Sequence, residues 1–151
     1  MAVPPRPLRV TAAVFGALAI VAVMSGCQGS GGPADAAPID LAGTAWLAED
    51  IDGRGVIDNA RSTLSFEDDR AAGSTGCNRY FGPFSVQGDE LGLGPLATTR
   101  RACPPALMDQ ERRFLAALES VTRYAYSRKG LLYLYDQTGA QRLRLSRTAE
   151  P

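Results

Sequence analysis

Few residues in this chain are of the types that enzymes use for acid, base or nucleophilic chemistry. The 151 residues include no histidine, so the usual general base at neutral pH is absent, along with Ser-His-Asp and Cys-His arrangements. The single lysine, Lys129, precedes Gly130 in a predicted hairpin turn, where it is a solvated charge rather than the base of a Ser-Lys dyad. We therefore expect no enzymatic activity and no cofactor.

Pairs of carboxylates are the remaining candidates for catalysis. Asp50 with Asp52, or Asp68 with Asp69, could supply an acid and a base, but glycoside hydrolysis needs two carboxyl groups that flank a cleft at a set separation. The Asp50-x-Asp52-Gly53 sequence is similar to the start of a calcium loop but lacks the downstream bidentate glutamate, so we expect no metal site. An unusual enzyme that uses such carboxylates is one hypothesis for this chain, and it predicts a buried pair of acidic residues.

Charge gives no reason to expect a nucleic-acid partner. Lys and Arg together number 16, as do Asp and Glu, and the glycine-rich stretch precedes no strand-to-helix unit that could cradle phosphates. The charges are unevenly spread, with the acidic residues concentrated before Leu91 and the basic residues after it. An antiparallel sheet that pairs the two halves would bring these charges opposite one another. A basic binding face is the alternative.

Cys27 follows a segment with the order of a bacterial lipoprotein signal. Arg6 and Arg9 precede an apolar run from Val10 to Met24, and two small residues then lead to the cysteine. We predict a signal peptide over residues 1–26 and acylation of Cys27 as the new N-terminus. The run of 15 residues is shorter than the roughly 20 of a spanning helix. A signal anchor and secretion without a lipid are the weaker alternatives.

Residues 27–40 are predicted to be the lipidated cysteine and a flexible linker, because they are rich in Gly, Ser, Ala and Pro without apolar periodicity. The lipid would make the membrane a partner and place the protein in the cell envelope, on the extracytoplasmic side of the membrane. Residues 41–147 are enough for one domain with a single core.

Cys77 and Cys103 are the two cysteines that remain for the domain. In an exported protein they are expected to form a disulfide. A reactive thiol or a metal pair is the alternative, but two cysteines without histidine make a poor zinc site.

Period-two patterns predict that the domain is built mostly of strands. Trp46 anchors the first strand, and Leu64 and Phe66 share one face of the second. The predicted strands cover residues 43–48, 61–67, 84–87, 90–93, 123–127, 131–135 and 141–145, with turns at 49–55, 88–89 and 129–130.

One segment has helical spacing. Leu107, Glu111, Phe114, Leu115 and Leu118 form a stripe after two prolines, which predicts a helix over residues 106–120 that packs this stripe on the sheet. The expected fold class is α+β, with a strongly curved antiparallel sheet or partial barrel of about 7–8 strands and one packed helix.

Several of these segments occur in an order that resembles a known family. They are GTAW ending at Trp46, LSFEDD around Phe66, GCNRYFGPF from Gly76, TTRRACP from Thr98, the predicted helix, and the closing GLLYLYDQTGAQRLRL. Over residues 41–147 the chain resembles the META domain, the HslJ-like family of bacterial envelope proteins. The resemblance implies a compact antiparallel domain with a packed helix, often lipid-anchored and associated with envelope stress or with resistance to small toxic compounds. It implies no enzymatic activity.

The family motif contains the most chemically varied cluster of the chain, formed by Gly76, Asn78, Arg79 and Tyr80 beside Cys77. We expect the side-chain amide of Asn78 to tie down the turn. Arg79 and Tyr80 either serve the fold or line a recognition surface.

Our leading hypothesis is therefore a noncatalytic, lipid-anchored envelope protein. It would contribute to envelope integrity or to tolerance of stress and small molecules by binding an unknown protein or small-molecule partner. The alternative is an envelope-anchored inhibitor of a secreted, lysozyme-type hydrolase.

Overall fold

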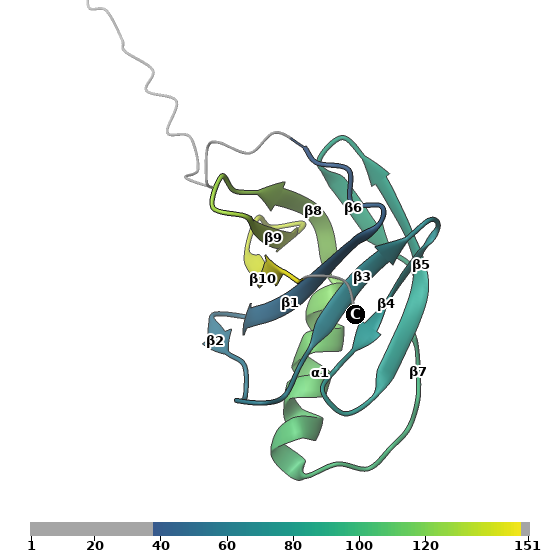
Figure 1. Cartoon of the computed structure of the whole chain (residues 1–151), viewed down its shortest axis with the longest axis vertical. Helices are drawn as coiled ribbons and strands as arrows, with labels where there is room; N and C mark the ends of the chain where they lie inside the picture. Colours follow the sequence, from purple (N-terminus) through teal and green to yellow (C-terminus); the bar gives the residue numbers. More distant parts are fainter. Residues whose placement is uncertain (1–37, 149–151) are drawn as a thin grey trace, which may run out of the picture. The chain divides into compact units, whose positions relative to one another are not determined.

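A computed structural model describes residues 38–148 of the chain (Figure 1). Within this range no helix is both long and apolar enough to span a membrane. The elements are β1 (Thr44–Ile51), β2 (Arg54–Gly55), β3 (Thr63–Glu67), β4 (Arg70–Ser74), β5 (Arg79–Gln87), β6 (Glu90–Leu93), β7 (Ala97–Thr98), α1 (Pro105–Glu119), β8 (Val121–Tyr126), β9 (Leu131–Asp136) and β10 (Gln141–Arg147).

The sheet is antiparallel and closes into a barrel. Eight strands follow one another in the order β10-β9-β8-β6-β5-β4-β3-β1, and β1 pairs in turn with β10. The short strands β2 and β7 extend this path beside β1 and β5. The prediction of a strongly curved antiparallel sheet with one helix is confirmed. The sheet is a closed barrel rather than a partial one, because the last strand returns to the first.

Alternation along the strands fills the barrel interior. Trp46 and Leu64 are fully buried, and the ring of Trp46 meets that of Tyr126 edge-on with centroids 5.9 Å apart. Helix α1 adds Phe114 and Leu118 to the same core, as its apolar stripe predicts. Within the described range, the buried core members lie between residues 41 and 145.

Two features of the sheet differ from the sequence-based expectation. Strand β1 continues into the predicted turn as far as Ile51, with an irregular register between Ala48 and Asp50. Strand β4, the first half of β5 and the two-residue strands β2 and β7 were not predicted at all. The β4 sequence, Arg-Ala-Ala-Gly-Ser, lacks the β-branched and aromatic residues that favour strands. It is extended because β3 and β5 pair with it on both sides.

Oppositely charged residues from the two halves of the chain meet across strands. Arg142 lies 2.6 Å from Asp52, and Arg144 lies 3.6 Å from Glu49 across the β1–β10 pair. This is the complementation predicted for an antiparallel sheet.

The predicted signal peptide, Cys27 and most of the predicted linker lie outside the described residues. The predictions of acylation and of a linker over residues 27–40 therefore remain predictions.

Candidate functional site

The family motif forms the tight connection between β4 and β5. Gly76 has a φ of +93°, a conformation that L side chains rarely adopt. The buried hydroxyl of Thr75 accepts the backbone N–H groups of Cys77 and Asn78 at 3.3 and 2.9 Å. Cys77 forms the predicted disulfide with Cys103. The turn is thereby fixed both by its own hydrogen bonds and by a covalent link to the segment before α1.

Asn78 bridges three separate parts of the chain. Its amide nitrogen donates to the backbone carbonyl of Arg101 at 3.2 Å and to the carboxylate of Glu111 on α1 at 3.0 and 3.1 Å. Its amide oxygen accepts the N–H of Arg101 at 2.7 Å and the hydroxyl of Thr99 at 2.9 Å. We call Thr75, Asn78, Thr99, Arg101 and Glu111 the polar clasp. Asn78 was expected to secure its own turn, but Thr75 does that, and Asn78 instead joins the turn to the loop and the helix.

Glu111 is the member of the clasp that sequence reasoning misjudged. It was counted in the apolar stripe of the helix, yet its carboxylate is buried and accepts hydrogen bonds from Asn78 and from the Thr75 hydroxyl. An acidic residue within an otherwise apolar helical stripe was the signal available, since a buried carboxylate requires hydrogen-bond partners.

The clasp does not have the arrangement of an acid–base site. Glu111 is the only buried carboxylate among residues 38–148, so the buried acidic pair required by the carboxylate-enzyme hypothesis does not occur in this range. Asp50 accepts the N–H of Gly53 at 2.8 Å, and Asp52 pairs with Arg142. No group of three or more Cys, Asp or Glu side chains in the described range could hold a metal ion.

Tyr80 belongs to the core and so serves the fold, and it also contributes to the lining of the groove described below. It is 1% exposed, its ring meets Phe114 with centroids 5.9 Å apart, and its hydroxyl donates to the Thr63 carbonyl at 2.7 Å. Burial raises the pKa of Tyr80 well above its ordinary value. Arg79 points the other way and is exposed, as strand alternation requires.

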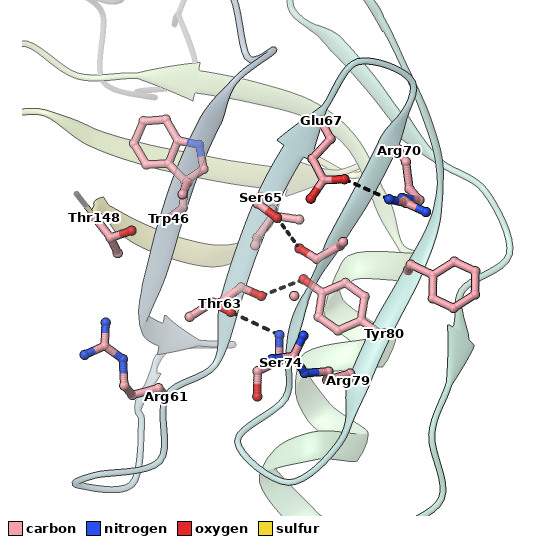
Figure 2. Close-up of a pocket in the computed structure, with 15 residues that line it drawn as sticks. Trp46, Arg61, Thr63, Ser65, Glu67, Arg70, Ser74, Arg79, Tyr80 and Thr148 are labelled. Carbon is pink, nitrogen blue, oxygen red and sulfur yellow. Dashed lines mark hydrogen bonds and ion pairs between the residues drawn. The ribbon is translucent and has the colours of Figure 1, made fainter. Parts of the chain in front are cut away.

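Arg79 lies at the rim of a groove on the outer face of β1, β3, β4 and β5 (Figure 2). The groove has a volume of about 660 Å³. Its floor is recessed because the outward positions of neighbouring strands carry small residues, Ala45, Ser65 and Ala72. Phe81, which is 53% exposed, also lines it. We call this feature the outer groove.

Opposite ends of the outer groove differ in charge. Arg61 and Arg79 lie at the end occupied by Ser74, whereas the Glu67–Arg70 ion pair, at 2.9 Å, lies at the other end (Figure 2). The first end therefore carries two cationic side chains, and the second end is neutral overall.

Comparisons with known proteins agree with this architecture. A structure from Burkholderia xenovorans solved by NMR is similar, with a TM-score of 0.60 and 26% sequence identity over 73% of this chain and 85% of that one. A second NMR structure has a TM-score of 0.55 and 24% identity over 68% of this chain and 87% of the other. A crystal structure of a DUF4847 family protein from Bacteroides vulgatus has a TM-score of 0.55, with 12% identity over 74% of this chain and 96% of that one, and it shows the fold alone.

A comparison with curated protein sequences finds no match. The family model of the META domain matches residues 39–149, which include the whole barrel, the polar clasp and the outer groove. The resemblance expected from the sequence is confirmed, and the chain belongs to the META domain family.

Proposed function

We propose that this chain is a noncatalytic binding protein, held on the extracytoplasmic side of the membrane by a lipid on Cys27. In this proposal the outer groove binds its partner. The observation that carries the proposal is a groove of about 660 Å³, within the size range of ligand pockets, with two arginines on its rim. The barrel interior is filled by core side chains, so a ligand is expected to bind on the outside.

The polar groups of the motif support a structural rather than a chemical role. Both the amide nitrogen and the amide oxygen of Asn78 are engaged within the domain, and so is the carboxylate of Glu111. Groups that are already hydrogen-bonded and buried hold a fold together, whereas a catalytic group must reach a substrate.

The disulfide and the N-terminal segment that ends at Cys27 support a location in the cell envelope. A covalent Cys77–Cys103 link suits an oxidising compartment. The apolar run that precedes Cys27 has the order of a lipoprotein signal. Partner binding at this location would contribute to envelope integrity or to tolerance of stress and small molecules.

Deletion and complementation in the source bacterium test the proposal. The deletion strain should survive antibiotic or heat challenge less well, and the wild-type gene should restore survival. A Cys27→Ala variant should fail to do so, because the protein is no longer held at the membrane.

Mass spectrometry of the membrane fraction should find a diacylglyceryl-modified peptide beginning at Cys27. Equal survival of the deletion strain under every challenge would refute the proposal. Specific retention of a lysozyme-type hydrolase by the domain would favour the inhibitor alternative instead.

A further inference from the structure

We infer that the outer groove takes an elongated organic anion, with one carboxylate bound between Arg61 and Arg79 and an apolar body lying along the floor. The inference rests on the proposed function of this groove as the binding site and names the chemical class of its ligand.

Strand register brings the two arginines to one end of the groove. Arg79 pairs directly with Ser74 on β4, and the N–H of Ser74 donates to the hydroxyl of Thr63 on β3 at 3.0 Å. Arg61 precedes Thr63 by two residues, beside the bridge between Ser62 and Thr75. The two side chains therefore rise from strands that are two spacings apart, roughly 10 Å. An anionic group between them is within reach of both.

The charge of this end is not neutralised by the domain. Neither Arg61 nor Arg79 has an ion-pair partner among residues 38–148, whereas Arg70 is paired with Glu67. A guanidinium group donates two parallel hydrogen bonds to a carboxylate. An incoming carboxylate would supply the missing counter-charge.

The floor of the groove favours a ligand with an apolar chain. The hydroxyl of Ser65 already donates to the carbonyl of Ala72 at 3.0 Å, and that of Thr63 accepts from Ser74, so few unpaired polar groups face the ligand. Ala45 and Ala72 offer methyl groups. The half-exposed ring of Phe81 adds a further apolar surface.

Three observations restrict the ligand further. Strands β3 and β4 are paired on both sides, so a peptide cannot join the sheet by backbone hydrogen bonds and recognition must come from side chains. At the far end Arg70 is already paired with Glu67, so this end offers no unpaired cation for a second negative charge. From Thr63 to Glu67 the floor extends roughly 13 Å along the strand. These features fit a monoanion with a single long chain.

NMR titration of the 15N-labelled chain from Gln28 onward, which contains every core residue of the described range, tests the inference with decanoate as the probe. Decylammonium and acetate serve as comparison ligands, because one reverses the charge and the other removes the apolar body. We expect saturable shifts of the Ser65, Ser74 and Thr148 amides with decanoate, and at least about tenfold weaker binding of the other two. The Arg61→Gln/Arg79→Gln variant should bind decanoate about tenfold more weakly, whereas the control Arg54→Gln/Arg100→Gln should stay within about twofold of wild type.

Equal affinity for decanoate and decylammonium would overturn the inference, as would wild-type affinity of the Arg61→Gln/Arg79→Gln variant. Binding that appears only after residues 149–151 are removed would identify the acidic end of the chain, with Glu150, as the occupant. Shifts of the same amides that depend on protein concentration alone would identify a second copy. Both results would also overturn the inference. If decanoate fails but the deletion strain still loses survival under stress, the ligand class alone is wrong and the proposed function stands.

Discussion

The side-chain amide of Asn78 donates to both carboxylate oxygens of Glu111, at 3.0 and 3.1 Å, and so joins the β4–β5 turn to the helix. Arg79 follows Asn78 directly, and its backbone N–H donates to the hydroxyl of Thr99 at 3.1 Å. The polar clasp therefore fixes the start of β5, and Arg79, the first residue of this strand, lies at the rim of the outer groove.

Replacing Asn78 by aspartate should show how much the polar clasp contributes to the free energy of unfolding. The isosteric change places a second carboxylate beside Glu111, and we expect the free energy of unfolding to fall by about 3 kcal/mol at pH 7, because one buried charge then lacks compensation. Urea unfolding at pH 7 measures the loss. Asn59→Asp, at an exposed turn position, is the control. A loss no larger than that of Asn59→Asp would contradict the assignment.

Removal of the disulfide should cost the domain much of its stability. The Cys77→Ser/Cys103→Ser variant opens a link between residues separated by 26 positions, and the chain-entropy model predicts a loss of about 3–4 kcal/mol. Urea unfolding with and without a reductant provides the test. The reductant should destabilise the wild-type domain and leave the variant unchanged. Unchanged wild-type stability after reduction would contradict a stabilising disulfide.

The burial of Tyr80 predicts a decline in stability at alkaline pH. The pKa of its hydroxyl is raised well above its ordinary value of 10.0 by burial, so the folded state retains a proton that the unfolded state loses. The stabilising contribution is complete below pH 10 and is lost as the pH rises further. Tyr80→Phe should reduce this alkaline slope and cost about 1 kcal/mol at pH 7, because the Thr63 carbonyl loses its donor. The free energy of unfolding of both proteins, measured from pH 8 to pH 11, tests the prediction. An equal dependence on pH in the wild type and in Tyr80→Phe would refute it.

Gly73 is required by the close approach of β3 and Tyr80. A Cβ at this position would lie 2.0 Å from the carbonyl oxygen of Thr63 and 2.9 Å from the Tyr80 hydroxyl. Gly73→Ala should therefore destabilise the domain by about 3 kcal/mol. Gly55→Ala, where nothing lies within 4 Å of the added Cβ, should change the midpoint of thermal unfolding little. Similar midpoints for the two variants would contradict the described packing.

The sequence predicted the elements whose residues carry strong local signals. The run of leucines and tyrosines at residues 131–135 and the apolar stripe ending at Leu118 predicted β9 and α1 nearly to the residue. Strand β4 was missed because Ala71, Ala72 and Gly73 have little preference for strands, and its pairing comes from neighbours distant in sequence. Tertiary context therefore decided its conformation.

The outer groove could not be predicted for a related reason. Ala45, Ser65 and Ala72 lie on three different strands, and their small size matters only once the strands are in register. In the same way, Glu111 and Asn78 are 33 positions apart. The motif containing Asn78 could be recognised in the sequence, but its partner could not, because the contact depends on how the helix packs.

The central claim is tested most directly by complementing the deletion strain with a variant whose outer groove is filled by a larger side chain, and then measuring survival. Ala72→Leu places a larger side chain on the half-buried floor, and Ala106→Leu makes the same change at an exposed position of α1. If the outer groove binds the partner, Ala106→Leu should restore survival under envelope stress and Ala72→Leu should not, with both variants folded and present at wild-type amounts in the membrane fraction. Full restoration by Ala72→Leu would contradict the claim.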